Sequence, residues 1–303
     1  MKIGIIGAGA MGCLYASLLS NENDVILLDV SKETVSAINN NGVLLKEVNG
    51  VERVYDLKAD FSGQYNGKLD LIIVFVKDTA GKAALSSNKN LITDETLLLS
   101  LQNGLGNFEI MEEFADKKQI LLGTTKHNCV TISPAEIYHS GSGITHIGSP
   151  SGNDEAVETV SEVFNKSGIG TVICQDVNRL LWEKLFINMT INSITALLDA
   201  KISVVVENEN ASNVIAKLLK EAIAVANADG EKFDFDKVYS DVMSTAETLG
   251  TGKASMCQDI ENKRKTEIDF INGAVVKLGR KYGIETPYHE MIVNLIHAKE
   301  SLF

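Results

Sequence analysis

The sequence predicts an α/β protein, with a doubly wound parallel sheet in residues 1–175 and an all-helical domain in residues 176–303. Three observations support this fold class. A glycine-rich turn separates a strand-like run from a helical run at the N-terminus. Apolar strand-like runs then alternate with helical stretches, which is typical of a parallel sheet covered by helices. After residue 175 the apolar pattern takes a helical period, and no further parallel strand is indicated.

The first element is the strand-like run KIGIIG, followed at once by GAGAMG with Gly7, Gly9 and Gly12 in GxGxxG spacing. The first glycine permits the tight turn, the second lets a pyrophosphate approach the backbone, and the third lets the helix pack closely on the strand. The following helix N-terminus offers amide hydrogens and partial positive charge to phosphates. We therefore predict a Rossmann dinucleotide-binding domain. The expected loop contacts are Gly7, Ala8, Gly9, Ala10, Met11 and Gly12.

The same N-terminal stretch also has features of a signal peptide. Lys2 precedes 17 uncharged residues, and MGC faintly suggests a lipidation site. We favour the interpretation as a nucleotide-binding loop, because the glycines have the GxGxxG spacing and a second strand follows.

The second strand, VILLD, ends at Asp29, 17 residues beyond Gly12. A carboxylate here can accept hydrogen bonds from the adenosine ribose hydroxyls of NAD. It would repel the extra phosphate of NADP by on the order of 4 kcal/mol at 4 Å, and Lys32 is the only nearby cation. NADH is therefore the expected cofactor in preference to NADPH. The alternative is that Asp29 is a solvated turn residue.

Further strands are expected at residues 69–77, 96–104 and 120–125. Ligands of such sheets bind at the carboxyl ends of the strands, which selects Lys77 and Asn103 as candidates. Either residue could instead be an ordinary polar side chain at the point where a strand leaves the core.

Residues 136–149 alternate polar and apolar positions, and we expect a hairpin that closes the first domain. It contains His139 and His146, which we interpret as structural. His127 follows a strand end and could face the cofactor. It is therefore the alternative proton donor.

Five helices are expected in the second half, near 178–199, 209–229, 234–248, 256–282 and 287–301, with a strand-like TVICQ just before them. The active cleft is expected between the two halves. In the first helix Lys184, Asn188 and Asn192 are spaced i, i+4 and i+8, so they share one side and drift by about 40° per step. This polar strip faces either a polar ligand or solvent, because burying such groups without partners costs about 1–3 kcal/mol each.

The fourth helix contains Ser255 and, twelve residues later, Glu267. Ser255 and Gln258 fit a capping box, although the start of a helix that faced the cleft would also suit a carboxylate ligand. Glu267 would lie more than three turns into the helix, and it could simply be one carboxylate among several neighbours.

Composition restricts the functional classes. The chain has 303 residues, 45% hydrophobic and 22% charged, with a net charge of −12. This acidic surface disfavours nucleic acids and anionic membranes as partners. The four cysteines show no metal-ligand or disulfide spacing, so we expect reduced thiols, no metal site and a cytoplasmic protein.

Several blocks together resemble the ketopantoate reductases. They are GAGAMG, LQNGLGN (101–107), GTTKH (123–127), GITHIG (143–148), WEKLFINMTINSITAL (182–197) and SMCQDI…TEIDFINGAVVKLGRKYGI (255–284). The last two are specific, whereas the glycine loop is not. The resemblance spans nearly the whole chain in the right order. It implies a Rossmann domain, an α-helical substrate domain and reduction of a 2-oxo acid to a D-2-hydroxy acid.

The resemblance also implies roles for individual residues. Lys184 would be the catalytic acid, stabilising the developing oxyanion and delivering its proton, with a pKa lowered by apolar neighbours. Glu267 would meet the cofactor ribose and the lysine, and Lys77 would lie near the nicotinamide. The residues implied at the substrate are Asn103, Asn188, Asn192 and Ser255.

Three positions depart from the family pattern. Asp29 stands where many members carry a basic residue for NADP. Gly252 replaces an Asn that often helps to bind the substrate's terminal hydroxyl, and Ala80 replaces a Gln. Sites that bond a hydroxyl discriminate strongly, whereas apolar pockets discriminate weakly. Branched apolar 2-oxo acids, such as 2-oxoisovalerate or benzoylformate, are thus as well supported as ketopantoate. The enzyme would then be an NAD-dependent D-2-hydroxyacid dehydrogenase.

A different class is a non-catalytic dinucleotide-sensing module, which the presence of Lys184 and Glu267 disfavours. The long C-terminal helices could mediate a homodimer, although no individual residue indicates one.

Overall fold

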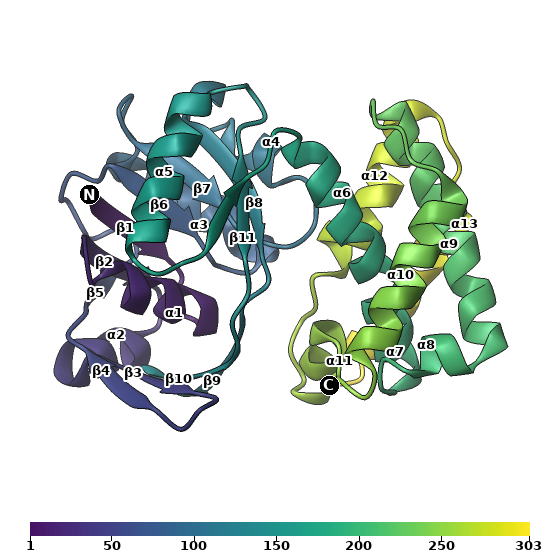
Figure 1. The fold of residues 1–303 in the computed structure, drawn as a ribbon, viewed down its shortest axis with the longest axis horizontal. Coiled ribbons are helices and arrows are strands. Elements are labelled where there is room, and N and C mark those ends of the chain that lie inside the picture. Colours follow the sequence, from purple (N-terminus) through teal and green to yellow (C-terminus); the bar gives the residue numbers. More distant parts are fainter. The chain divides into compact units, whose positions relative to one another are not determined.

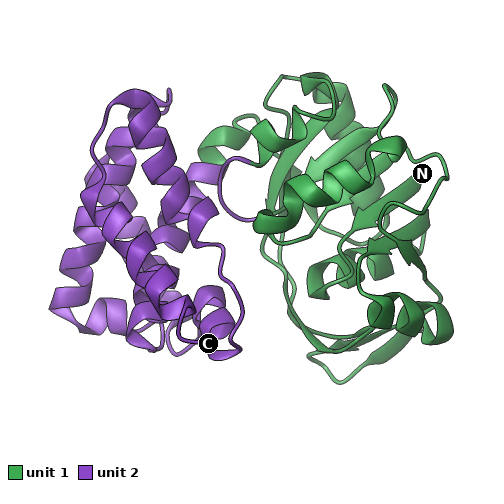
Figure 2. Cartoon of the chain, turned by 180° about the vertical axis from the view of Figure 1, so that it is seen from behind, with its two compact units in different colours: residues 1–102, 107–180 green, residues 103–106, 181–303 purple.

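The computed structural model describes residues 1–303. The chain forms two compact units: Met1–Gln102 with Asn107–Leu180, and Asn103–Gly106 with Leu181–Phe303 (Figure 2). Unit 1 is α/β and unit 2 is helical, which confirms the predicted fold class. The domain ranges 1–175 and 176–303 stay predictions.

The larger sheet of unit 1 has eight strands. In spatial order they are β12 (Thr171–Ile173), β11 (Thr145–Gly148), β8 (Ile120–Thr125), β7 (Leu97–Ser100), β6 (Leu71–Val74), β1 (Lys2–Ile6), β2 (Asp24–Asp29) and β5 (Lys58–Phe61). From β5 to β8 all neighbours are parallel. This is the 3-2-1-4-5-6 strand order of a Rossmann sheet, in which the order reverses between β1 and β6.

The predicted hairpin at residues 136–149 is wrong, because its two strands lie in different sheets. β11 pairs with β8 and β12. The other strand, β10, belongs to a second sheet that the sequence pattern does not indicate. Its strands are, in order, β4 (Glu52–Tyr55), β3 (Val43–Glu47), β10 (Glu136–Gly141) and β9 (Asn128–Ser133). Ile137 and His139 of β10 are buried, so the alternating pattern is real, but their strand partners lie elsewhere in the chain.

Five α-helices belong to unit 1. They are α1 (Ala10–Leu19), α2 (Lys32–Asn41), α3 (Gly81–Ser87), α4 (Asn107–Met111) and α5 (Asp154–Lys166). Helix α1 contacts strands of both sheets, and α5 packs against β11 and β12 (Figure 1). Every residue of β6 is buried, as expected for a parallel strand covered on both faces.

Unit 2 is built around Trp182, Phe186 and other buried apolar side chains. Its helices are α6 (Val177–Ile187, which starts in unit 1), α7 (Ser193–Leu198), α8 (Val204–Glu207), α9 (Glu209–Ala228), α10 (Phe235–Leu249), α11 (Ser255–Glu261), α12 (Asn272–Tyr282) and α13 (Pro287–Glu300). No helix combines the length and hydropathy needed to cross a membrane.

The single helix predicted at 256–282 is also wrong. Helix α11 ends at Glu261, because Lys263 takes a left-handed conformation (φ 53°) and the Arg264 N–H donates to the Asp259 carbonyl at 2.8 Å. This six-residue closure is a helix C-terminal motif. A short 3₁₀ turn (Ile268–Phe270) precedes α12. Glu267 therefore occupies the N-cap position of a turn between helices and does not lie inside a helix.

Candidate active site

The glycine-rich loop joins β1 to α1 in the geometry that the spacing predicts. Gly7 has φ 103°, which side chains other than glycine rarely adopt. A Cβ on Gly12 would overlap the Gly7 carbonyl oxygen, so the helix needs glycine to pack on the loop. A Cβ on Gly9 would meet nothing within 4 Å. The loop therefore leaves bare backbone beside Gly9.

Helix α1 begins at Ala10 with no side-chain cap and no acidic residue in its first turn. The first amides of a helix lack intrahelical partners and carry partial positive charge. An uncapped start after a glycine loop, at the point where the strand order reverses, fits a dinucleotide pyrophosphate.

Asp29 ends β2 and is tied to the glycine loop. Its Oδ2 accepts the Ala8 N–H at 2.7 Å, and its Oδ1 accepts the Ser31 N–H at 2.8 Å. These two bonds fix the carboxylate, which is half-buried, beside the loop. A carboxylate has about four acceptor positions, so both oxygens can still accept ribose hydroxyls.

Lys77 is exposed and lies three residues beyond the end of β6, at the start of a 3₁₀ turn (Asp78–Ala80). It belongs to unit 1 together with the glycine loop and Asp29. Its role near a nicotinamide stays a prediction.

His127 belongs to a chain of polar groups inside unit 1. Its Nδ1 lies 3.0 Å from His139 Nε2, and His139 Nδ1 lies 2.8 Å from Glu47 Oε2. Burial, and then the neighbouring His139, lower the pKa of His127. A histidine with a lowered pKa is mostly neutral at pH 7, so only a small fraction carries the proton that a general acid donates. This weakens the case for His127 as the acid. His139 is buried and hydrogen-bonded, as a structural histidine would be.

The polar strip of unit 2 passes from α6 into a π-helical segment, Asn188–Asn192, that continues into α7. π turns are rare and occur frequently at functional sites. Because a π turn holds more residues than an α turn, it counteracts the forward drift of about 40° per four residues. Lys184, Asn188 and Asn192 therefore stay closer to one line than the ideal α-helix predicts.

Buried hydroxyls support this wide turn. Thr190, Ser193 and Thr195 each donate to the carbonyl four residues earlier, at 2.5 to 2.7 Å. Asn272 of α12 donates its Nδ2 to the Met189 carbonyl at 3.0 Å. Asn272 was not among the site residues predicted from the sequence. The hydroxyl-rich MTINSIT was the available signal for an irregular helix, because such hydroxyls bond to carbonyls one turn back.

Two pairs of predicted site residues meet within unit 2. Asn192 Nδ2 donates to Ser255 Oγ at 3.3 Å, and Asn103 Nδ2 donates to Glu267 Oε2 at 3.3 Å. Asn103 is placed here because Gly104 packs on Phe270, whose carbonyl accepts the Leu105 N–H at 3.1 Å. The capping box predicted for Ser255 is wrong: Ala254 is the N-cap residue, and no side chain caps the helix.

Lys184 is half-buried on α6, and its sequence neighbours Trp182, Leu185 and Phe186 are fully buried. The three apolar side chains anchor α6 in the core of unit 2. The long lysine stem can pack along apolar surface while its ammonium group extends away from it. The predicted lowering of the Lys184 pKa stays a prediction.

Two family models match the chain. Ketopantoate reductase PanE/ApbA matches residues 3–152, and its C-terminal model matches residues 176–300. The 2-dehydropantoate 2-reductase of Streptococcus pyogenes serotype M3 is 34% identical over 306 residues, covering 100% of this chain and 99% of the relative. The enzyme of the same name from Pyrococcus horikoshii is 34% identical over 303 residues, covering 100% and 98%.

Solved structures agree with this family. The ternary structure of D-mandelate dehydrogenase with NADH and anilino(oxo)acetate has a TM-score of 0.94 and 31% identity, covering 100% of this chain and 99% of that one. A 2-dehydropantoate 2-reductase from Geobacter metallireducens has a TM-score of 0.90 and 28% identity, covering 98% and 99%.

Fold, glycine loop and relatives together define an NAD(P)-dependent oxidoreductase with a small keto acid as its substrate. The chain belongs to the ketopantoate reductase family.

Proposed function

We propose that the protein reduces a branched apolar 2-oxo acid to the D-2-hydroxy acid with NADH. One observation carries this proposal: a lysine and two amides form a line on α6 and the π-helical segment, and that line ends on Ser255. An ammonium group beside neutral hydrogen-bond donors suits a substrate with a reactive carbonyl and a carboxylate.

Each residue has a role in this mechanism. The nicotinamide, when bound, supplies a hydride to the keto carbon. The carbonyl electron pair moves to oxygen, and the Lys184 ammonium stabilises that charge and donates its proton. Asn188 and Asn192 hold polar groups of the substrate. Ser255 and Asn103 bind its carboxylate end.

Glu267 completes the proposed set. Its carboxylate accepts from Asn103 and could also meet the cofactor ribose and the lysine. This hydrogen bond orients the Asn103 amide.

The preference for NADH rests on Asp29. Both of its oxygens accept backbone N–H groups, so the carboxylate cannot swing away from an added phosphate without breaking these bonds. The nearby side chains of Lys32 and Glu33 are exposed and opposite in charge, so they offer little net compensation.

We expect Asp29→Asn to raise the ratio of kcat/KM for NADPH to that for NADH by about tenfold or more, because the like-charge repulsion is removed. Steady-state kinetics with both cofactors measure this ratio. The control is Glu33→Gln, an exposed acid in the first turn of the following helix, α2. An unchanged ratio in Asp29→Asn would contradict the cofactor assignment.

The preference for an apolar substrate rests on Gly252. The residue is exposed, and it offers no side chain to bond a terminal hydroxyl. A Cβ there would lie 3.1 Å from the Leu249 carbonyl oxygen and 3.7 Å from Ile202 Cδ1, so a side chain needs only a small adjustment. The likeness to D-mandelate dehydrogenase supports the same choice.

We expect wild-type kcat/KM with 2-oxoisovalerate or benzoylformate to equal or exceed that with ketopantoate. Gly252→Asn should shift the ratio towards ketopantoate by about tenfold, since a new hydroxyl contact contributes about 1–2 kcal/mol. Gly252→Ala controls for the added Cβ. Ketopantoate preferred by orders of magnitude in the wild type would exclude the apolar substrate class.

We also propose that the protein is cytoplasmic. The four cysteines are thiols rather than disulfides, which supports a reducing, cytoplasmic environment. A homodimer stays a prediction that light scattering can check.

A further inference from the structure

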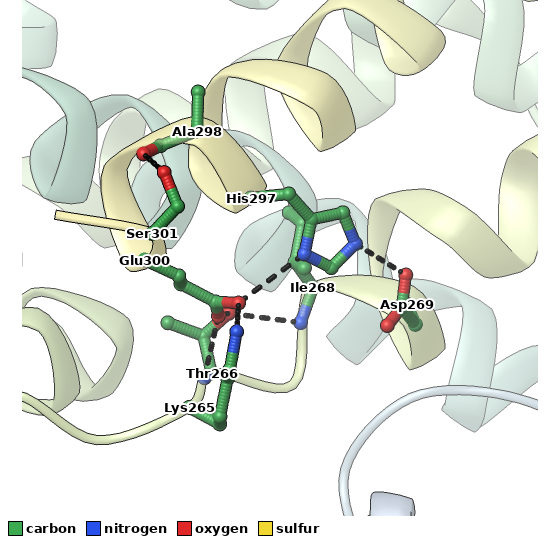
Figure 3. A network of polar contacts seen from close by, with 8 residues as sticks. All are labelled: Lys265, Thr266, Ile268, Asp269, His297, Ala298, Glu300 and Ser301. Atoms are coloured by element: carbon green, nitrogen blue, oxygen red, sulfur yellow. Dashed lines mark hydrogen bonds and ion pairs between the residues drawn. The ribbon is translucent and has the colours of Figure 1, made fainter. Parts of the chain in front are cut away.

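The segment that carries Glu267 is held by the C-terminal helix. Figure 3 shows the cluster, which we call the α13 clamp: Lys265, Thr266, Asp269, His297 and Glu300. Glu300 Oε1 accepts the Thr266 N–H at 2.8 Å and the Thr266 hydroxyl at 2.7 Å. Its Oε2 accepts from Lys265 Nζ at 3.1 Å and from His297 Nδ1 at 3.2 Å.

His297 links this carboxylate to a second one. Its Nε2 lies 2.9 Å from Asp269 Oδ1. Carboxylates only accept, so the imidazole donates from both nitrogens and is the charged form. Burial alone would lower the pKa of His297, but the hydrogen bonds and charges of Asp269 and Glu300 outweigh it and raise that pKa.

Glu300 occupies a costly position. Its side chain is only 2% exposed, and it ends a helix, where the macrodipole disfavours negative charge. Burial raises the pKa of this carboxyl. The hydrogen bonds from Thr266, Lys265 and His297 lower that pKa by more, so that it falls to about 2. An apolar residue would fill such a position at a lower cost in free energy. The carboxylate therefore indicates that its hydrogen bonds fix another part of the chain.

The hydrogen bonds of Glu300 fix the backbone around Glu267. The Thr266 N–H is bound by Glu300, and the Thr266 hydroxyl accepts the Ile268 N–H at 3.3 Å. The Glu267 carbonyl accepts the Phe270 and Ile271 N–H groups at 3.0 and 3.1 Å. With this backbone fixed, the Glu267 carboxylate is directed towards Asn103.

We propose that Glu300 is a positioning residue for the reaction: it acts through Thr266 to fix the direction of Glu267 and its contact with Asn103. This inference rests on the role proposed for Glu267. Glu300 touches no reacting atom, so its effect must disappear when Glu267 has already lost its charge.

The decisive experiment is a double-mutant cycle of Glu300→Gln and Glu267→Gln, measured as kcat on the preferred 2-oxo acid. Glu300→Gln should lower kcat about tenfold or more in the wild-type background, since small misplacements of positioned groups are costly. In the Glu267→Gln background it should cause no further loss. Equal losses in both backgrounds, or no loss in the first, would overturn the proposal. Glu290→Gln on the same helix, whose exposed carboxylate pairs with Arg280, is the control.

A second pair of variants covers the case in which Glu300→Gln does not fold. Thr266→Val removes the hydroxyl at nearly constant volume and should lower kcat, whereas Thr266→Ser should retain wild-type kcat. Equal rates for both variants would argue against the clamp.

Hydrogen exchange separates this inference from the proposed function. If the wild type reduces no 2-oxo acid, the proposed function fails. The clamp still predicts faster amide exchange at residues 265–269 in Glu300→Gln than in Glu290→Gln, and equal exchange would refute it.

The difference in the free energy of unfolding between wild type and Glu300→Gln should also narrow as pH falls below about 4.5 towards 2. The reason is that a carboxyl with a depressed pKa stabilises the fold only above that range.

Discussion

Lys184→Met is expected to lower kcat by about 10²- to 10⁴-fold, the usual contribution of a positioned general acid. Methionine keeps the length and apolar stem of lysine, so the packing at this half-buried position should survive. The variant should therefore melt near the wild-type temperature and bind NADH normally. What it loses is the ammonium group that stabilises the alkoxide and supplies its proton.

The measurement is steady-state kinetics with NADH and the preferred 2-oxo acid, together with NADH affinity by fluorescence. Lys277→Met, at an exposed lysine of α12, is the matched control and should keep the wild-type rate. If Lys184→Met reduced substrate as fast as wild type, Lys184 would not be the acid. If the wild type itself bound NADH but reduced no 2-oxo acid, a dinucleotide-sensing module would become the better interpretation.

The parts of this fold that follow local rules could be predicted from the sequence. The KIGIIG strand, the glycine loop and Asp29 lie within 29 residues, and their contacts are made inside one β–α–β unit. The spacing of Lys184, Asn188 and Asn192 indicated a shared helix side, although it did not predict the π-helical segment at Asn188–Asn192. Local pattern was sufficient because each of these features depends on residues close in the chain.

The second sheet could not be predicted, because its pairing is not local. β10 pairs in parallel with β3, more than 90 residues earlier, and the register Glu136–Leu44 to His139–Glu47 leaves no sequence signature. The alternating pattern of 136–149 correctly indicated strands, but alternation does not identify a partner strand.

The break between α11 and α12 was missed for a related reason. No proline or glycine lies between Cys257 and Ile271, so the local pattern allows a continuous helix. The break is stabilised by contacts that propensity does not encode: a left-handed Lys263 and the distant Glu300, which binds Thr266. The Asn103–Glu267 contact joins residues 164 positions apart, and only the family resemblance suggested that they belong to one site.

The glycine loop allows a test of dinucleotide binding that is independent of the substrate. Gly9 has φ −76° and ψ −168°, which alanine can adopt, and its Cβ would meet no protein atom within 4 Å. Gly9→Ala should therefore leave the free energy of unfolding unchanged. If a pyrophosphate lies against this bare backbone, the new methyl group should weaken NADH binding by about tenfold or more, equivalent to about 1.4 kcal/mol.

Gly12→Ala provides the contrast, with a larger effect. Its Cβ would overlap the Gly7 carbonyl oxygen, so α1 must move relative to β1. We expect a loss of stability of about 1–3 kcal/mol from overpacking, and a loss of NADH affinity on the order of 10²-fold from the displaced helix amides. Thermal melts and NADH fluorescence titrations measure both quantities for each variant. The two substitutions share one loop and differ in whether the added methyl group meets protein or ligand. If Gly9→Ala bound NADH as tightly as wild type, the pyrophosphate would therefore have to lie elsewhere.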